Sequence, residues 1–257
     1  AFRTNTKQRG AGLMKQILTV ANKEFHDGLR NRWLVSITLI FALLSIGLTY
    51  FGAAASGAVG VTSLSTTVAS LASLAVFLIP LIALLLSYDS FVGEQESGTL
   101  LLLLTYPLSK GQLLLGKFIG QGGIIALATL LGFGASAVLL YFQLGDINIL
   151  SAFGLFIVSA ILLGLSFTAI SYLISLSVSE KSKAAGFALI TWFLFALAFD
   201  LALLALLVGV EEGVTQQGLT QLMMLNPTDI FRLVNLAGLE SSDVNGALAV
   251  AINASLS

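Results

Sequence analysis

The sequence contains no cysteine and only one histidine, His26, among its 257 residues. The lack of cysteine excludes disulfides, thiolate metal sites and cysteine nucleophiles. A single histidine leaves most zinc sites and hydrolase triads without their ligands or bases. Methionine is scarce as well, and the pair Met223 and Met224 stands in an apolar run, which is more typical of packing than of copper binding. We therefore predict no metal site, no catalytic residue and no cofactor bound by this chain.

Charged residues are also few. They make up 10% of the chain, against about 25% in a soluble domain, and 57% of the residues are hydrophobic. The net charge of −1 gives no indication of nucleic-acid binding. Because a membrane-spanning helix needs about 20 apolar residues, the apolar segments predict five spans in an all-α polytopic membrane protein. They are residues 33–51, 68–88, 118–142, 150–178 and 186–210.

Proline and glycine residues inside these spans indicate how the helices pack. Pro80 lies in the second span, where a packed membrane helix tolerates proline. Glycine allows neighbouring helices to approach closely. The glycines expected to do so are Gly132, Gly134, Gly154 and Gly164.

Lysine and arginine are distributed unevenly around the spans. Eleven of the twelve precede the first span or lie between spans two and three or four and five, and only Arg232 falls on the opposite side. The positive-inside rule therefore predicts a cytoplasmic N-terminus, a cytoplasmic loop over residues 89–117 and a periplasmic loop over residues 211–257. Residues 1–13 are interpreted as a leader or extension ahead of a single transmembrane domain, residues 14–257.

The stretch Met14–Asn31 predicts a helix of a different kind. Its apolar residues recur at helical spacing, and charged residues occupy the other face. We expect this helix to lie in the cytoplasmic interface of the membrane, with Trp33 as a belt residue at the start of the first span. It either orients a partner protein or serves as a plain anchor, and the spacing does not separate the two.

One short motif is similar to a nucleotide site. Residues 111–118 read GQLLLGKF, whereas a phosphate-binding loop reads G-x-x-x-x-G-K-[S/T]. The last position should supply a hydroxyl for magnesium but is Phe118, and no apolar strand precedes the motif. Lys117 stands where a membrane helix meets the cytoplasm, which is a normal place for lysine. We predict that this segment binds no ATP.

The longer segment around this motif reads DSFVGEQESGTLLLLLTYPLSKGQLLLGKF, residues 89–118. It combines two carboxylates, a Ser-Gly-Thr sequence and a leucine run that is too short to cross a membrane. The alternatives for that run are an interfacial or re-entrant helix and a surface buried against another protein. The pattern resembles the cytoplasmic loop of type-2 ABC transporter permeases, in which a short coupling helix docks on a separate ATPase subunit. The resemblance implies the coupling residues Glu94, Glu96, Ser97, Gly98, Thr99, Pro107 and Lys110.

Four further segments narrow the resemblance. DGLRNRW (27–33), PLIALLLSYD (80–89), SEKSKAAG (179–186) and LNPTDIFRLVNLAG (225–238) are similar to the permeases of the ABC complexes that mature nitrous oxide reductase. The resemblance implies a multi-pass protein of the bacterial inner membrane with an N-terminal elbow helix and a six-helix topology. Only five spans are seen here, so a sixth is expected to be missing after residue 243.

The same resemblance implies partners for the chain. Such permeases form homodimers with the ATPase subunit NosF, which holds ATP and magnesium, and with the periplasmic protein NosD. They serve copper–sulfur cluster assembly on nitrous oxide reductase, together with the copper chaperone NosL. The permease would either transmit motion to the periplasmic partner or export a sulfur species. The alternatives are another type-2 exporter, of a drug, lipid or ion, and a secondary transporter, for which no inverted repeat is evident.

The outer part of the chain contains two more candidates. Asp200 is the one acid inside a predicted span, and no basic residue within the spans is available to pair with it. It is expected to be protonated or hydrogen-bonded, as a gate, a dimer contact or a packing contact. The motif NPTDIFR predicts the start of an amphipathic periplasmic helix, capped by Asn226, that lies on the membrane or against NosD. The residues implied in the contact with NosD are Asn226, Pro227, Thr228, Asp229 and Arg232.

Overall fold

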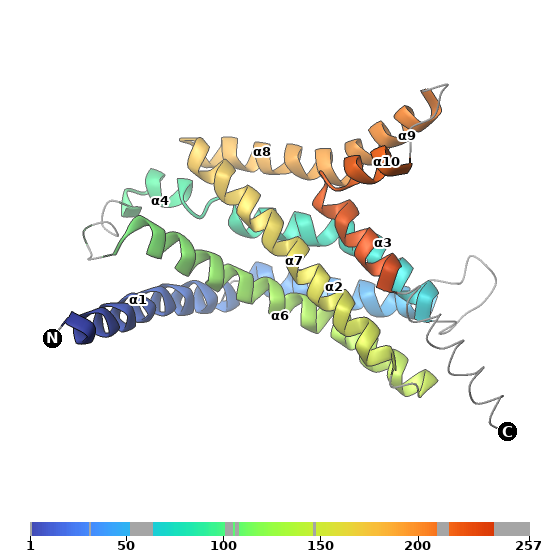
Figure 1. The fold of residues 1–257 in the computed structure, drawn as a ribbon, viewed down its shortest axis with the longest axis horizontal. Helices are drawn as coiled ribbons and strands as arrows, with labels where there is room; N and C mark the ends of the chain where they lie inside the picture. The colour runs from blue at the N-terminus through green and yellow to red at the C-terminus, as the bar shows by residue number, and fades with distance from the viewer. Residues whose placement is uncertain are drawn as a thin grey trace. The chain divides into compact units, whose positions relative to one another are not determined.

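The structure is a computed structural model that describes residues 2–30, 32–51, 64–100, 105, 108–145, 148–209 and 216–238. Every regular element in these ranges is helical (Figure 1). The helices are α1 (Phe2–Arg30), α2 (Arg32–Phe51), α3 (Leu64–Ser87), α4 (Val92–Glu96), α6 (Lys110–Leu144), α7 (Asn148–Ser177), α8 (Lys181–Phe193), η2 (Leu194–Ala198), α9 (Phe199–Gly209) and α10 (Gln216–Met223). A last helical segment covers residues 227–238.

Four stretches of helix are long and apolar enough to cross a membrane. They are Leu64–Glu96, Lys110–Leu144, Ile149–Ser177 and Lys181–Gly209. A fifth span is present if Met14–Arg30 and Val35–Phe51, a pair bent by 71° at the break between them, counts as one. The prediction of an all-α polytopic membrane protein is therefore confirmed. The prediction that the sixth span is missing concerns residues 239–257, which lie outside the described part of the chain.

The long helices differ from the predicted spans mainly at one end. α6 begins at Lys110 rather than at Phe118, so its first turns carry two lysines. α3 contains Pro80 and continues to Ser87, as a packed membrane helix allows.

The chain divides into two compact units, and each of the long helices that follow α1 contributes a part to both. Unit 1 comprises residues 1–37, 80–128 and 164–193, and unit 2 comprises residues 38–79, 129–163 and 194–257.

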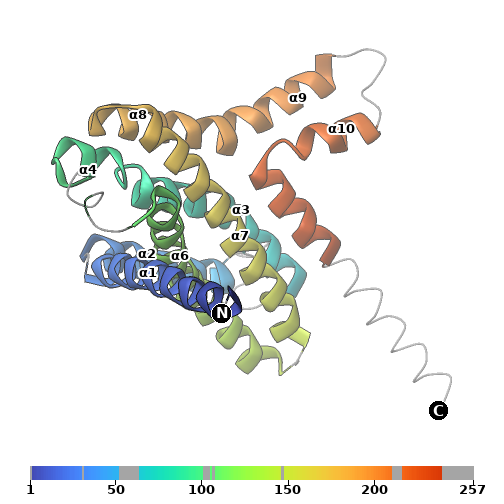
Figure 2. The ribbon, with the colours of Figure 1, turned by 60° about the vertical axis from the view of Figure 1, so that its left-hand side comes forward.

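In unit 1, α1 packs directly on the first part of α6, and the two helices lie side by side in Figures 1 and 2. The contact depends on two glycines of α6. A Cβ atom at Gly116 would lie 2.6 Å from the Val20 side chain, and one at Gly120 would lie 2.6 Å from the carbonyl oxygen of Ala21. Because any larger residue would push the helices apart, these glycines fix the close approach of α1. The predicted amphipathic helix therefore packs part of its surface on protein.

In unit 2, the core is built from aromatic side chains. The rings of Phe41 and Phe133 lie 4.6 Å apart in an edge-on arrangement, and Phe133 makes the same contact with Phe156 at 4.6 Å. Phe231, in segment 227–238, extends the cluster, with its ring 5.6 Å from that of Phe156. All four side chains are buried. This cluster holds segment 227–238 against α7.

The predicted packing glycines have different surroundings in the structure. A Cβ atom at Gly132 would collide with the ring of Phe41, so this glycine does permit close approach. Gly134 and Gly154 have open space where a Cβ atom would be, so they permit no close approach among the described residues. Sequence alone did not reveal Gly116 and Gly120, because their role depends on which helix lies opposite them.

Candidate functional site

The candidate site is built around a short turn between α3 and α6, here called the α4 turn, residues 88–99. α4 ends at Glu96, and Gly98 follows with φ +71°. This left-handed backbone strongly favours glycine. The Ser97 hydroxyl donates to the carbonyl of Gly93 at 2.8 Å and lies 2.9 Å from the Thr99 hydroxyl. Local chemistry thus closes the turn without help from another element.

The first residues of the α4 turn are fixed to α7. The backbone N–H groups of Phe91 and Val92 both donate to the Ser175 hydroxyl oxygen, each at 3.1 Å. The Phe91 ring packs edge-on against Tyr172 at 5.0 Å between centroids. Phe91, Val92 and Ser175 are all buried. A buried hydroxyl therefore satisfies the two backbone donors at the start of α4.

A second chain of hydrogen bonds joins the same turn to α6. The Gln121 side-chain amide donates to the Ser90 hydroxyl at 2.6 Å. The Tyr172 hydroxyl donates to the Gln121 carbonyl oxygen at 3.0 Å. Ser90, Gln121 and Tyr172 are buried, so each of these bonds forms away from water.

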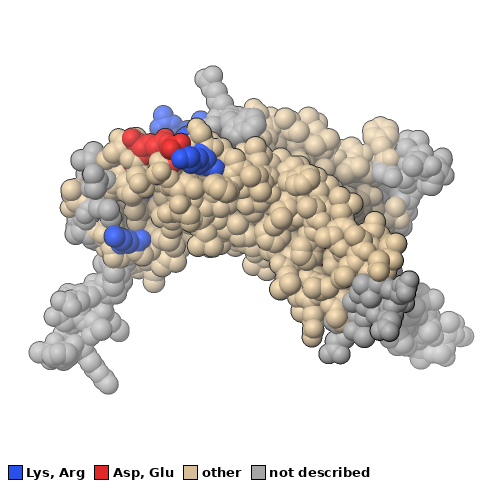
Figure 3. Space-filling model, turned by 90° about the horizontal axis from the view of Figure 1, so that it is seen from above, with Lys and Arg blue, Asp and Glu red and all other residues tan. Residues whose placement is uncertain are grey.

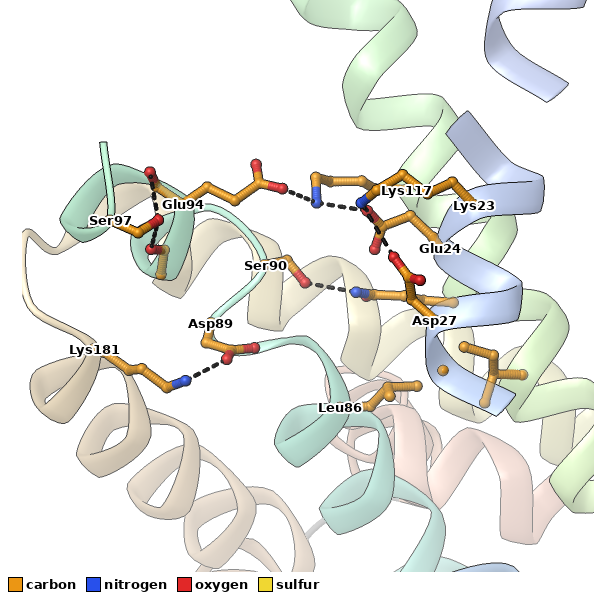
Figure 4. A pocket seen from close by; sticks show the side chains of 14 residues that line it. Lys23, Glu24, Asp27, Leu86, Asp89, Ser90, Glu94, Ser97, Lys117 and Lys181 are labelled. Carbon is orange, nitrogen blue, oxygen red and sulfur yellow. Dashed lines mark hydrogen bonds and ion pairs between the residues drawn. The ribbon is translucent and has the colours of Figure 1, made fainter. Parts of the chain in front are cut away.

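The turn also takes part in an ionic contact that is largely shielded from water (Figure 4). The ammonium of Lys117, on α6, lies 2.7 Å from a carboxylate oxygen of Glu94 and 2.9 Å from one of Glu24, on α1. Only 3% of the Lys117 side chain is exposed, and the two glutamates are largely covered. The second carboxylate oxygen of Glu94 is buried and has no hydrogen-bond partner among the described residues. Lys117, Glu24 and Glu94 are called the Lys117 cluster below.

The other side of the α4 turn is attached to the beginning of α8, which lies beside it in Figures 1 and 2. The Lys181 ammonium lies 2.6 Å from the Asp89 carboxylate, and the Lys181 backbone N–H donates to Glu96 at 2.7 Å. These side chains are about half exposed, so the contact orients the turn more than it stabilises it.

Between these elements lies a polar cavity of about 400 Å³. Charged side chains of both signs line it, and each of its lysines is paired with a carboxylate. The described surface in Figure 3 shows acidic side chains gathered in one area with basic ones beside them, while the remainder is almost entirely uncharged. A protein surface in contact with lipid has this character. The charged lining residues are Lys23, Glu24, Asp27, Asp89, Glu94, Lys117 and Lys181.

The residues predicted for coupling fall into three groups. Glu96, Ser97, Gly98 and Thr99 form an exposed tip, and Lys110 is exposed at the start of α6. Glu94 points inward to Lys117, so its side chain is engaged within the chain. Pro107 lies outside the described residues.

Sequence reasoning misjudged one residue of the site and missed two others. Lys117 was predicted to be an ordinary interfacial lysine, but it is buried between two carboxylates. Glu24 and Ser175 were not singled out. Their contacts with the α4 turn or Lys117 join residues more than eighty positions apart, and no local pattern marks such pairs. The one sequence feature that could have pointed to this site is a lysine, Lys117, inside a run that is otherwise helical and apolar.

Unit 2 contains a second cluster of charges, which corrects the expectation for Asp200. Arg232 reaches this acid from segment 227–238, with 2.7 Å between guanidinium and carboxylate, and also lies 3.0 Å from Asp229. The predicted spans contain no base, but the chain after α10 supplies one. Arg232, Asp200 and Asp229 are called the Arg232 cluster below.

A π-helical turn, η2, lies next to this cluster and explains how segment 227–238 is attached. A π-turn disturbs the regular hydrogen-bond ladder of a helix. The Phe195 carbonyl in η2 accepts hydrogen bonds from the Asn226 amide at 3.0 Å and the Thr228 hydroxyl at 3.2 Å. The Asn226 side chain also accepts the Thr228 backbone N–H at 3.0 Å, which confirms that Asn226 caps this helix.

Because of these contacts, most of the residues predicted to contact a periplasmic partner are not exposed. Asn226, Thr228 and Asp229 are fully buried within unit 2, and Pro227 and Arg232 are partly covered. Burial raises the pKa of Asp229, the charge of Asp200 raises it further, and Arg232 opposes both. The side chains of this segment that remain open to a partner are apolar. They are Ile230, Val234 and Leu236, which are 42%, 39% and 57% exposed.

Comparison with known proteins places these features in a family. A sequence model described as "ABC-2 family transporter protein" matches residues 18–256. A protein of Pseudomonas aeruginosa described as "Probable ABC transporter permease protein NosY" is 55% identical over 241 residues, which cover 93% of this chain and 88% of the relative. A protein of Stutzerimonas stutzeri with the same description is 56% identical over 232 residues, covering 89% and 84%. The chain therefore belongs to the ABC-2 family of transporter proteins, as a membrane permease subunit.

Proposed function

We propose that this chain is the membrane subunit of an ATP-driven complex that serves the maturation of nitrous oxide reductase. In this proposal a homodimer of the chain sits in the bacterial inner membrane with its N-terminus in the cytoplasm. An ATPase related to NosF binds ATP and magnesium and docks on the α4 turn. A periplasmic protein related to NosD binds on the other side, and a copper chaperone related to NosL delivers the metal. Identity of 55% to a NosY permease is the observation that carries the proposal.

The form of the α4 turn supports a docking role. Its base is fixed by buried contacts to α6 and α7, while Glu96, Ser97 and Thr99 at its tip are exposed. A rigid base with an exposed polar tip suits a surface that receives force from another subunit, because a loose loop would absorb the displacement.

The proposed partners on the other side have apolar surfaces to bind. Ile230, Val234 and Leu236 present an exposed apolar face in segment 227–238, which suits a periplasmic protein or the membrane surface. In the helix Lys181–Gly209, only 6% of the most apolar stretch is buried inside the chain, which leaves it open to lipid or to a second copy.

Within this proposal we favour transmission of motion over transport of copper. The chain has no cysteine, and its single histidine precedes the first span. A copper path would need thiolate, thioether or imidazole ligands along the spans. Transmission of motion requires only that the α4 turn be connected to the helices behind it, and the contacts of unit 1 provide such connections.

The test uses a nitrous-oxide-reducing bacterium that lacks its own permease gene and expresses this chain with an affinity tag. We expect the ATPase subunit to co-purify and the reductase to regain its copper. Gly98→Val should abolish both, because a β-branched residue at φ +71° distorts the tip. Gly111→Ala is the matched control, since Gly111 is exposed on α6 with open space around it. Failure of the unmodified chain to bind an ATPase would contradict the proposal.

A further inference from the structure

Lys117 is unusual among the lysines with described side chains because it is buried and holds two carboxylates that belong to two different helices. Stability does not require such an arrangement. A buried ion pair costs so much desolvation that apolar residues of similar volume are often as stabilising. The unpartnered second oxygen of Glu94 adds to that cost. A charge at this position is therefore better explained by what it connects.

We infer that Lys117 is a positioning residue that joins the α4 turn to α1, so that displacement of the turn by an ATPase also moves α1. The inference rests on the proposed function and deepens it, because it names the residue through which force leaves the docking surface. The connection runs from Glu94 on α4 through the Lys117 ammonium on α6 to Glu24 on α1.

The packing around Lys117 makes this connection stiff. Gly116 and Gly120, one residue before it and three after it, are two of the points where α1 touches α6. Glu24 itself is part of that contact, since a Cβ atom at Gly120 would lie 2.7 Å from its Cβ atom. The ionic contact and the close helix packing therefore occur on the same turn of α6, and α1 cannot shift there without moving Lys117.

The charges of the cluster also make the connection dependent on lysine. Two carboxylates face the Lys117 ammonium, and the only other ammonium on them is that of the exposed Lys23, which lies 3.5 Å from Glu24 and is shared with Asp27. Without the ammonium, Glu24 and Glu94 would repel each other in a poorly hydrated setting. Loss of Lys117 should therefore separate α4 from α1 rather than merely loosen them.

The experiment compares the full complex of permease, ATPase and periplasmic partner with and without the lysine. In Lys117→Met, we expect the ATPase to stay bound and to hydrolyse ATP, while the amount of reductase matured per ATP falls. The expected fall lies within the roughly 5- to 150-fold range that typical coupling between sites produces. Lys117→Arg, which keeps the charge, should restore most of the ratio. An unchanged ratio in Lys117→Met would overturn the inference.

Two further variants separate positioning from folding. Lys117→Met with Glu24→Gln and Glu94→Gln leaves no unpaired charge, so it should fold normally and remain uncoupled. Recovery of coupling in this triple variant would overturn the inference. Lys23→Met is the matched control, because Lys23 lines the same cavity but pairs with Glu24 and Asp27 on its own helix. An unmodified complex that hydrolyses ATP but matures no reductase would contradict the proposed function instead.

Discussion

The Lys117 cluster of unit 1 and the Arg232 cluster of unit 2 contain the same chemistry, one base between two carboxylates. They differ in what the base connects. Lys117 binds acids from α1 and α4 and lies on α6, so it links three elements. Arg232 binds Asp229 three residues earlier on its own helix, and only Asp200 belongs to another element. The Arg232 cluster therefore attaches one helix to its neighbour, whereas the Lys117 cluster can transmit movement among three.

Burial separates the two clusters further. The Lys117 side chain is 3% exposed and that of Arg232 is 34% exposed. Attraction between charges is strong in a poorly hydrated interior and weak near solvent or polar surroundings. The free-energy cost of leaving a charge unpaired is likewise larger in the interior than near solvent. The Lys117 cluster should therefore respond more strongly to loss of its base, even though Asp229, at 1% exposed, is the most buried acid of the two clusters.

The largest effect is expected for Lys117→Ala. This change leaves Glu94 without its ionic partner and Glu24 with only the more distant Lys23, in largely covered surroundings. Breaking a buried ion pair costs about 3–5 kcal/mol. The free energy of unfolding of the purified permease, measured in detergent or nanodiscs, should fall by that amount. Adding Glu24→Gln and Glu94→Gln should restore much of the loss. If Lys117→Ala costs no more than Arg232→Ala, the contrast between the clusters is wrong.

A second prediction concerns the glycine contact beside Lys117. Gly120→Val should place a side chain against the backbone of Ala21 and force α1 away from α6. Overpacking of this kind costs about 1–3 kcal/mol, and coupling should fall with it, because the Lys117–Glu24 contact lies on the same turn. The control is Gly134→Ala, where a Cβ atom meets open space and helix propensity favours alanine. Equal thermal stability of the two variants would rule out this account of the packing.

Arg232→Met should have a smaller effect, about 1–2 kcal/mol, since the arginine is partly exposed and Asp229 keeps its bond from Asn226. Thermal unfolding measures the loss. The companion change Asp200→Asn tests the pair from the other side, and it should cost less because Asp229 retains Arg232. A loss as large as that of Lys117→Ala would show that unit 2 depends on its charges equally.

The smallest effect is a dependence on pH. The pKa of Asp229 is raised above its ordinary value of 3.8 by burial and by Asp200, so the native state holds this proton more tightly than the unfolded chain. Its contribution to stability is therefore fully present below 3.8 and is lost as pH rises through the raised pKa. Melting temperatures of the wild type should fall relative to Asp229→Asn over that window. A parallel dependence on pH in both proteins would contradict the shift.

The features that sequence predicted well depend on local patterns. Apolar runs gave the membrane helices, because composition over about 20 residues decides whether a segment can cross a bilayer. The cap at Asn226 followed from residue types at adjacent positions, and the structure confirms it. The exposed tip of the α4 turn was likewise in the predicted segment.

What sequence did not give depends on contacts between distant residues. Lys117 meets Glu24 across 93 positions and Asp200 meets Arg232 across 32, and no spacing rule connects them. Gly116 and Gly120 of α6 were overlooked for the same reason, since close packing depends on which helix lies opposite. The segment GQLLLGKF illustrates both kinds of missed contact, a distant ion pair and a close helix contact. It was predicted to bind no ATP, and in the structure Gly116 supports helix packing while Lys117 carries the ionic contact.

The most direct test of the central claim measures the distance between α4 and α1 during ATP turnover. The chain has no cysteine of its own, so spin labels can be placed at Gln95→Cys and Asn22→Cys, two exposed positions on these helices. In the complex with its ATPase, the distance distribution should stay narrow and the two labels should move together. In the Lys117→Met background we predict a longer and broader distribution that changes with nucleotide. An identical distribution with and without Lys117, in every nucleotide state, would contradict the claim that Lys117 joins the α4 turn to α1.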